Sequence, residues 1–240
     1  MNNIKLNMKR LVILSGAGVS AESGLRTFRD SDGLWENYPV EQVASIDSWP
    51  HNKELMIDFY NQRRHDIERA QPNAAHKYIA ELEKYYNVTV ITQNIDNLHE
   101  RAGSSHVIHL HGEITKARSE KISSEESFYL PDKVKYIGYS DIKYGDKADD
   151  GGQMRPHIVW FGEAVPFLQT AAEYVSQADI LIVIGTSLNV YPAAGLVNYT
   201  KDGAMIYLID PKPIHLNLPN FKQFHATATE GMKQLYDMLL

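Results

Sequence analysis

Residues 11–18, Leu-Val-Ile-Leu-Ser-Gly-Ala-Gly, are the stretch that decides the fold. Four consecutive apolar residues indicate a strand buried on both faces, as in a parallel sheet, and the glycines after them indicate a tight turn. Similar apolar runs recur at residues 88–92, 180–184 and 205–209. Helical patterns lie between and after these runs, at residues 73–86, 167–178 and 229–240. Strands that alternate with helices predict an α/β fold built on a doubly wound parallel sheet.

Two stretches interrupt this alternation. Residues 38–71 predict a helix and no strand, and residues 114–155 are irregular and rich in charge and tyrosine. Because a structureless loop of that length is rare inside a compact domain, we predict that both are insertions that form a smaller second lobe. The remaining residues, 1–37, 72–113 and 156–240, are then expected to form the domain of the parallel sheet.

The composition excludes several classes of protein and of site. The 240 residues include no cysteine, which excludes disulfides, thiolate zinc sites and cysteine nucleophiles. A formal charge of −6 argues against sequence-independent binding of nucleic acid, which needs a basic surface. No apolar run is long enough to cross a membrane or to form a signal-peptide core, so we expect a soluble cytoplasmic protein with no membrane partner.

The first glycine turn is a candidate phosphate site. Gly16, Ala17 and Gly18 follow a strand and precede a predicted helix, whose N-terminus favours negative charge. The usual dinucleotide motif has a third glycine where this chain has Ala21, and it needs an acidic residue about 20 positions later that is missing here. An ordinary dehydrogenase is therefore a poor fit, and a purely structural turn is an alternative. Residues 185–187, Gly-Thr-Ser, form a second such turn after a later strand.

Polar side chains gather just after the second predicted strand. Gln93, Asn94 and Asp96 follow residues 88–92, and the carboxyl ends of strands are where open α/β sheets bind ligands. Amide and carboxylate groups there suit ribose hydroxyls and a carboxamide. The alternative is an Asn- and Asp-rich turn that caps a helix.

Two further segments carry groups suited to chemistry. His109 and His111 alternate as neighbours on one face of a strand do. Three interpretations stay open: a metal pair completed by Glu113, hydrogen-bonded structural histidines, or one general base, which a pKa of about 6.5 suits. Residues 156–163 are apolar and aromatic, and are either a core strand or an exposed edge to which an extended peptide adds.

In this order and spacing, these segments resemble the sirtuin family of NAD-dependent protein deacylases. The resemblance runs from about residue 10 to the C-terminus. The motifs that carry it are residues 16–24, Thr27-Phe28-Arg29, residues 92–96, His111-Gly112-Glu113, residues 160–163 and residues 185–187. The ordered set, rather than any single motif, is specific to the family.

The resemblance implies a Rossmann-like domain that binds NAD, as a co-substrate, in a cleft beside a smaller lobe. In the family, the carbonyl oxygen of an acyl-lysine displaces nicotinamide from the ribose, and a histidine then activates a ribose hydroxyl. His111 would be that base, and Asn94 and Asp96 would orient the ribose and the nicotinamide amide. The implied NAD contacts are Gly16, Ala17, Gly18, Ala21, Thr27, Phe28, Arg29, Trp35, Gln93, Asn94, Ile95, Asp96, Gly185, Thr186, Ser187, Asp210 and Ala228.

The resemblance also implies contacts with an acylated lysine in a protein or peptide. The segment that would hold the substrate backbone as a β-strand is Val159, Trp160, Phe161 and Gly162. Tyr60 and Arg63 share one face of a predicted helix and match a Tyr-x-x-Arg pair of sirtuins active on malonyl- and succinyl-lysine. A phenol and a guanidinium suit a carboxylate at the end of an acyl chain. The alternative is a surface arginine beside a half-buried tyrosine.

The chain departs from the family at its zinc site. Most sirtuins bind a structural zinc ion with two Cys-x-x-Cys pairs, but this chain has no cysteine, and residues 114–155 contain no histidine. We therefore expect a metal-free small lobe held together by its tyrosines, its phenylalanine and ion pairs. The main interpretation is an NAD-dependent lysine deacylase that removes acetyl, succinyl and malonyl groups. A sirtuin-like mono-ADP-ribosyltransferase and a non-catalytic NAD or ADP-ribose sensor are the alternatives.

Overall fold

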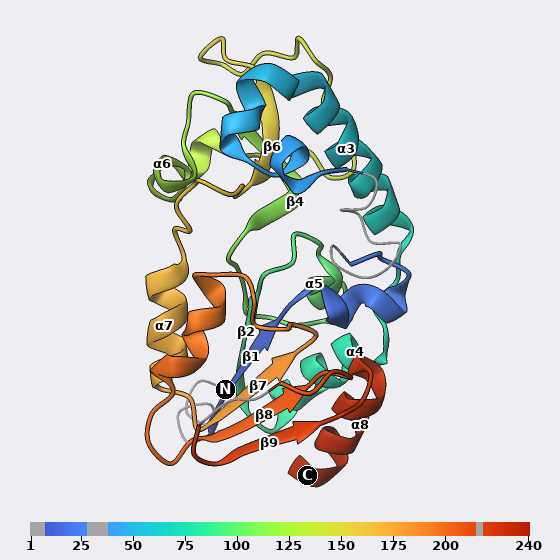
Figure 1. Ribbon diagram of the computed structural model, residues 1–240, viewed down its shortest axis with the longest axis vertical. Coiled ribbons are helices and arrows are strands. Elements are labelled where there is room, and N and C mark those ends of the chain that lie inside the picture. The colour runs from blue at the N-terminus through green and yellow to red at the C-terminus, as the bar shows by residue number, and fades with distance from the viewer. Residues whose placement is uncertain (1–7, 28–37, 215–217) are drawn as a thin grey trace.

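A parallel sheet forms the centre of the larger lobe (Figure 1). The computed structural model describes residues 8–27, 38–214 and 218–240, so the expectations for Phe28, Arg29 and Trp35 lie outside the described residues. In spatial order the strands are β3 (Val107–His109), β2 (Asn87–Thr92), β1 (Arg10–Ser15), β7 (Ile180–Ile184), β8 (Met205–Ile209) and β9 (Phe221–Phe224). Each neighbouring pair is parallel, which confirms the predicted α/β fold.

The strand order reverses between β1 and β7. The chain runs outward from β1 through β2 to β3, and later returns to the other side of β1 with β7 and β8. In open α/β sheets, a crevice forms at the carboxyl ends of the two strands where the order reverses, and ligands bind there.

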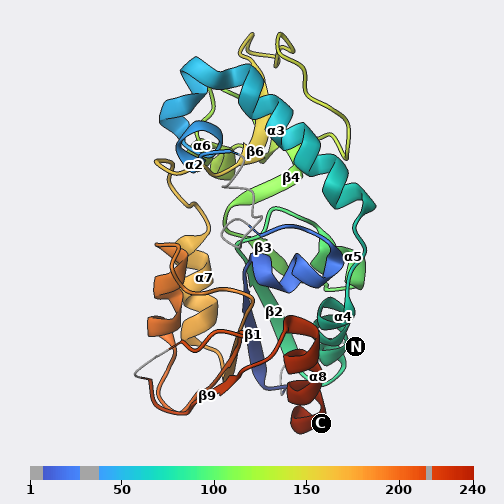
Figure 2. The ribbon, with the colours of Figure 1, turned by 45° about the vertical axis from the view of Figure 1, so that its right-hand side comes forward.

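Helices cover both faces of this sheet (Figure 2). On one face lie α4 (Ala74–Glu81) and α8 (Ala228–Leu239), and on the other lie α7 (Leu168–Ser176) and the 3-10 helix η6 (Ala193–Tyr199). The side chains of β1 alternate between them: Leu11 and Ile13 pack toward α4 and α8, whereas Val12 and Leu14 pack toward α7 and η6. Burial on both faces explains the uninterrupted apolar run.

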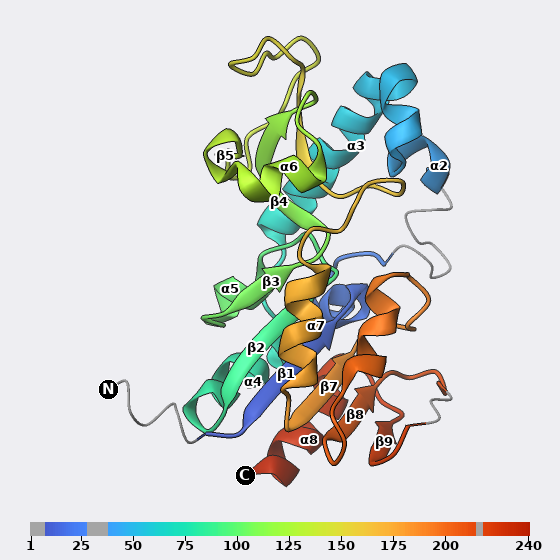
Figure 3. The ribbon, with the colours of Figure 1, turned by 90° about the vertical axis from the view of Figure 1, so that its left-hand side faces the viewer.

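The smaller lobe is an antiparallel sheet packed against one long helix (Figure 3). Its strands are β4 (Gly112–Ser119), β5 (Lys135–Tyr136) and β6 (Met154–Ile158), and its long helix is α3 (Trp49–Arg69). The shorter elements are α2 (Val40–Val43), η3 (Ile46–Ser48), α6 (Ser124–Tyr129) and η5 (Pro131–Lys133) in this lobe, and η2 (Ala17–Ser23), η4 (Leu82–Lys84) and α5 (Leu98–Ala102) in the larger one. The boundaries between the two lobes that the sequence suggests, at residues 113/114 and 155/156, fall inside β4 and β6.

Buried ion pairs lie at the centre of the smaller lobe. The side chains of Arg118 and Arg155, 0% and 1% exposed, donate to the carboxylate of Glu163 at 2.9 and 2.8 Å. The guanidinium of Arg155 also lies over the indole ring of Trp160, 3.4 Å from its centroid. Since charged groups are buried only when they are paired, these three residues specify how β4, β6 and the segment after β6 fit together.

The expectation that tyrosines and a phenylalanine hold this lobe together is wrong for four of the five aromatic side chains of the second insertion; the fifth, Tyr139, packs against the core and donates from its hydroxyl to Oδ1 of Asn97 at 3.1 Å. The aromatic side chains of the second insertion that face solvent are Phe128, Tyr129, Tyr136 and Tyr144, which are 38% to 73% exposed. The apolar core under α3 is instead filled by Met56, Ile57 and Phe59 of that helix together with Ile114 of β4. Within the described ranges, no group of three or more His, Asp or Glu side chains is arranged to hold a metal ion. None of the described helices is long and apolar enough to cross a membrane.

Candidate active site

The two glycine turns meet where the strand order reverses. Gly18 N–H donates to the carbonyl of Gly185 at 2.8 Å, and a Cβ added to Gly18 would lie only 2.8 Å from the Cα of Gly185. Gly185 itself has a φ of +64°, and a Cβ there would lie 2.2 Å from the nitrogen of Val19. Both positions therefore require glycine, because the two turns pack backbone against backbone.

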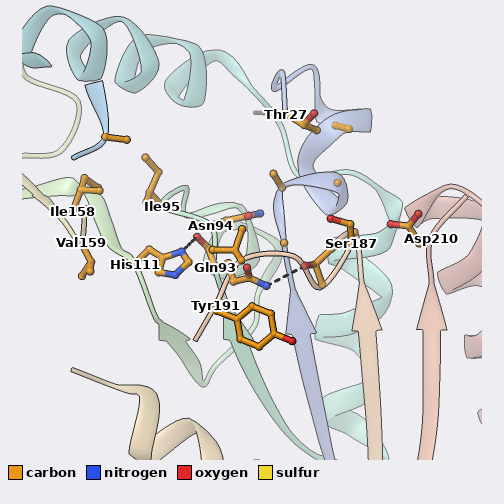
Figure 4. A pocket seen from close by; sticks show the side chains of 18 of the residues that line it. Thr27, Gln93, Asn94, Ile95, His111, Ile158, Val159, Ser187, Tyr191 and Asp210 are labelled. Atoms are coloured by element: carbon orange, nitrogen blue, oxygen red, sulfur yellow. Dashed lines mark hydrogen bonds between the residues drawn. The ribbon is translucent and has the colours of Figure 1, made fainter. Parts of the chain in front are cut away.

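A cavity of about 480 Å³ opens beside these turns, at the carboxyl ends of β1, β2, β7 and β8 (Figure 4). It has the size typical of ligand sites. The predicted site residues that line it are Gly16, Ala17, Gly18, Ala21, Thr27, Tyr60, Gln93, Asn94, Ile95, His111, Val159, Trp160, Phe161, Gly162, Gly185, Thr186, Ser187, Asp210 and Ala228. Asp96 and Arg63 are buried nearby but are not part of its lining.

His111 stands in the cavity wall between β3 and β4, with one ring nitrogen already bonded. Its Nδ1 lies 3.0 Å from the carbonyl oxygen of Gln93, a bond that Figure 4 draws. Because a carbonyl oxygen only accepts, Nδ1 carries the proton, and in the neutral ring Nε2 keeps its lone pair. Burial lowers the pKa of His111, which favours this neutral form. Of the three interpretations given for this histidine, a general base fits best.

The loop after β2 is held by a buried hydrogen-bond network. The Oγ of Ser20 donates to Oδ2 of Asp96 at 3.0 Å and accepts from Nδ2 of Asn94 at 3.2 Å. The other carboxylate oxygen of Asp96 accepts from the backbone N–H of Leu98 at 3.1 Å, at the start of α5. Asp96 therefore orients Ser20 and the loop from beneath, whereas Asn94 itself reaches the cavity.

Sequence reasoning missed the second layer of this network. Ser15 ends β1, and its buried Oγ lies 2.9 Å from the Oγ1 of Thr92 and 3.0 Å from Nε2 of His99. The ring of His76 packs edge-on against that of His99, and burial lowers the pKa of His76 to about 4, so it is neutral. The one signal in the sequence is that a hydroxyl residue ends each of two apolar strands.

The far end of the cavity is built from the ends of β7 and β8 and the start of α8. Gln93 Nε2 donates to Thr186 Oγ1 at 3.2 Å, which ties β2 to β7. Asp210 accepts the backbone N–H of Lys212 with Oδ1 at 2.8 Å. Glu22, which was not predicted, lines this end and accepts the backbone N–H of Thr229 at 2.8 Å, at the first turn of α8.

Tyr60 and Arg63 lie on one face of α3, at the small-lobe side of the cavity. The hydroxyl of Tyr60 accepts from Nε1 of Trp160 at 2.9 Å. Burial raises the pKa of Tyr60 well above its ordinary value, so the phenol keeps its proton. Nη2 of Arg63 donates to the backbone carbonyl of Arg26 at 3.0 Å. The structure thus puts the phenol in the cavity wall and the guanidinium behind it.

The segment after β6 is only partly paired. Phe161 N–H donates to the carbonyl of Ala44 at 2.8 Å, and its own carbonyl accepts from Ile46 N–H at 3.0 Å. In the part of the chain that the structure describes, the carbonyl of Val159 and the N–H of Gly162 have no such partner, and both residues line the cavity. Of the two interpretations for this segment, an edge with backbone groups left for a further strand fits better.

Comparison with known proteins assigns the family. Residues 16–192 match the model of the Sir2 family. The chain belongs to the Sir2 family. The NAD-dependent protein deacylase of Bacteroides thetaiotaomicron is 53% identical over 236 residues, which are 97% of this chain and 99% of that protein. The NAD-dependent protein deacylase of Helicobacter pylori is 51% identical over 234 residues, or 97% of this chain and 98% of that protein.

Solved Sir2 structures share the whole fold. A Sir2 homologue in complex with NAD has a TM-score of 0.84 and 37% identity, over 100% of this chain and 94% of that one. A Sir2 variant with a deacetylated p53 peptide and 3′-O-acetyl ADP-ribose has a TM-score of 0.80 and 29% identity, over 98% and 96%. Sir2 membership therefore accounts for both lobes of this chain, and not for the parallel sheet alone.

Proposed function

We propose that this chain removes acyl groups from lysine side chains of proteins or peptides with NAD as co-substrate, and that it acts on acetyl and preferentially on succinyl and malonyl groups. The coarser assignment, an NAD-dependent protein deacylase, follows from Sir2 membership and from two relatives of that name at 53% and 51% identity. The observation that supports the finer assignment is that His111 and Tyr60 line the same cavity.

His111 is assigned as the general base. In the first step the acyl carbonyl oxygen displaces nicotinamide at the ribose, which leaves an imidate. Nε2 of His111 then takes the proton of a ribose hydroxyl as that oxygen attacks the imidate carbon. Addition of water and loss of the amine give free lysine and O-acyl-ADP-ribose. The bond from Nδ1 to the Gln93 carbonyl, 3.0 Å long, keeps Nε2 in the tautomer that this step needs.

Backbone donors beside the glycine turns suit the phosphates. The N–H groups of Gly16 and Gly18 already donate to carbonyls within the protein. Among the described residues, the N–H groups of Ala17, Thr186 and Ser187 donate to no protein carbonyl, and all three line the cavity. We assign these three as the phosphate donors, since clustered backbone N–H groups form anion sites.

The adenosine is assigned to the far end of the cavity. Within the described part of the chain, the Asp210 side chain accepts a hydrogen bond through Oδ1 alone, so Oδ2 remains to accept a ribose hydroxyl. Ala228 begins α8, and Glu22 holds that helix start in place through Thr227 and Thr229.

The acyl tail is assigned to the Tyr60 side of the cavity. Because the Tyr60 oxygen accepts the indole N–H of Trp160, its own proton is left to donate to a carboxylate. Arg63, one helical turn further along α3, adds positive charge behind the phenol. The Val159 carbonyl and the Gly162 N–H, whose residues line the same cavity as Tyr60, are assigned to the amides of the substrate lysine.

One experiment separates this function from its alternatives. Acetyl- and succinyl-lysine peptides are incubated with the protein, with and without NAD, and the masses of the products are measured by mass spectrometry. We expect loss of both acyl groups only with NAD, formation of O-acyl-ADP-ribose, and no turnover with His111→Ala. ADP-ribosylated peptide would point to a mono-ADP-ribosyltransferase, and NAD binding without turnover would point to a sensor. A cytoplasmic location, which we also propose, is checked by cell fractionation.

A further inference from the structure

His109 is a second histidine beside the base, and the reaction described above gives it no role. It ends β3, in register with Thr92 of β2, and its side chain is buried. Its Nδ1 lies 3.0 Å from the backbone carbonyl oxygen of Asn94, and its Nε2 lies 2.7 Å from Oε1 of Glu100. One ring therefore joins β3 and α5 to the loop that carries Asn94 and Asp96.

The contacts of His109 decide its charge. A carbonyl oxygen only accepts, so Nδ1 donates to Asn94; a carboxylate also accepts, so Nε2 donates to Glu100. An imidazole that donates from both nitrogens is an imidazolium. Among the described residues, the ring of His111, two residues later, bonds through Nδ1 alone, to the Gln93 carbonyl. The two rings thus bond successive carbonyls of one loop while holding different charges.

We propose that His109, kept as an imidazolium by Glu100, is a positioning residue that fixes residues 93–96 in their reactive conformation. Loss of its proton then sets the alkaline limit of the pH range in which the enzyme is active. The proposal rests on the roles assigned above to His111 and Asn94. A neutral His109 has one N–H, so loss of its proton releases either the Asn94 carbonyl or Glu100. In either case the bridge that this ring makes from the Asn94 carbonyl to Glu100 of α5 is broken, and the backbone that carries the Asn94 side chain is held less tightly.

The charges around His109 support this assignment. Burial disfavours a charge on this ring, but the hydrogen bond and attraction to Glu100, together with the charge of Glu113 on β4, outweigh it and raise the pKa of His109 above its ordinary 6.5. Burial also works against the charge of Glu100, yet its hydrogen bond to His109 and the nearby Lys116 lower its pKa. The pair is therefore ionised on both sides near neutral pH.

The other histidines around His109 stay uncharged. Burial, and then the charge of His109, hold the pKa of His99 on α5 well below its ordinary value. Burial, and then the charge of Arg118, lower the pKa of His157 on β6 to about 3. Among these rings, His109 is thus the one whose proton loss changes the contacts of the loop at mildly alkaline pH.

The sign of the pH effect follows from the two rings. The base must be unprotonated, so activity rises through the pKa of His111, which burial lowers. The positioning residue must be protonated, so activity falls through the pKa of His109, which Glu100 raises despite burial. The expected profile is a bell whose acid side belongs to His111 and whose alkaline side belongs to His109.

Glu100→Gln tests the proposal, because glutamine keeps the shape and an acceptor oxygen but removes the charge that holds the proton. NAD-dependent deacylation is measured from about pH 6 to pH 10 at saturating NAD and peptide. We expect the midpoint of the alkaline side of the profile to fall by about one pH unit, with the KM for peptide unchanged. At a pH above the alkaline midpoints of both proteins, the variant should then be about tenfold slower than the wild type. Glu81→Gln, which removes an exposed carboxylate paired with Lys84, is the control and should leave the profile in place.

A second measurement reads the charge without activity. In a nitrogen-15 spectrum of the imidazole side chains, assigned with His109→Gln, both nitrogens of His109 should carry protons at neutral pH, and only one of His111 should. An alkaline side that stays in place in Glu100→Gln, or a neutral His109, would overturn the proposal. A wild-type protein that removes no acyl group with NAD would instead overturn the proposed function.

Discussion

Glu163→Gln is expected to destabilise the protein strongly, because it removes the carboxylate that lies between two buried arginines. Arg118 donates to Glu163 at 2.9 Å, Arg155 donates twice at 3.0 and 2.8 Å, and the backbone N–H of Trp160 donates at 2.9 Å. Glutamine keeps one acceptor oxygen, but its amide turns two N–H donors toward guanidinium groups that have only donors. Both arginines then stay buried with an uncompensated charge.

The magnitude follows from the burial. Breaking a buried ion pair by removing one partner costs about 3–5 kcal/mol, and the remaining amide oxygen puts Glu163→Gln near the lower end, at about 3 kcal/mol. For a chain of this size that corresponds to a fall in Tm of about 6–12 °C. Thermal and urea unfolding, followed by circular dichroism, measure both quantities.

A surface pair provides the matched control. Lys135 and Asp149 form an ion pair whose side chains are 49% and 74% exposed, so Asp149→Asn should leave Tm nearly unchanged. If Glu163→Gln lowered Tm no more than Asp149→Asn does, the claim that a buried ion network holds the smaller lobe together would be refuted.

Four further outcomes are expected. Arg63→Met, which removes the positive charge behind the phenol, should lower kcat/KM for succinyl-lysine by about tenfold and deacetylation far less; equal losses would contradict the acidic-acyl pocket. Gly18→Ala, which puts a Cβ 2.8 Å from Gly185, should raise the KM for NAD and leave that for peptide, as steady-state kinetics would reveal. Although burial opposes it, the arginines lower the pKa of Glu163. The stability that this carboxylate contributes is therefore fully present above pH 4.5, its ordinary pKa, and is lost as the pH falls through the lowered pKa of the folded protein. In acid unfolding, the difference in stability between wild type and Glu163→Gln should accordingly shrink as the pH falls. Dialysis against a chelator should leave Tm unchanged, and metal analysis that finds about one zinc ion per chain would contradict a metal-free lobe.

The sheet was predictable where strands are buried on both faces. The apolar runs at residues 88–92, 180–184 and 205–209 became β2, β7 and β8, because a parallel strand between two helical layers needs apolar side chains at every position. Strands β3 and β9 are only three and four residues long and lie at the sheet edges, so their apolar content is too small to mark them. The helix predicted from residue 73 begins there because Asn73 caps it: its Oδ1 accepts the N–H of Ala75 at 2.9 Å.

The smaller lobe was not predictable in the same way. Its tyrosines suggested a core, but Tyr136 is 73% exposed, because α3 already fills the space inside. The residues that do fill part of the centre are arginines, which a sequence pattern assigns to the surface. Whether an arginine is buried depends on a carboxylate brought to it by the fold, and Glu163 lies 45 residues from Arg118.

The sequence by itself determined the parallel sheet, the two glycine turns and the order of the motifs, because each of these follows from a few neighbouring residues. Only the tertiary structure decided the charges. His109 and His111 are the same residue type two positions apart, yet the fold places the Glu100 carboxylate beside His109, whereas Nε2 of His111 has no partner among the described residues. A pKa depends on burial and on charges within a few ångströms, and those neighbours come from α5 and from the loop after β2 rather than from the adjacent sequence.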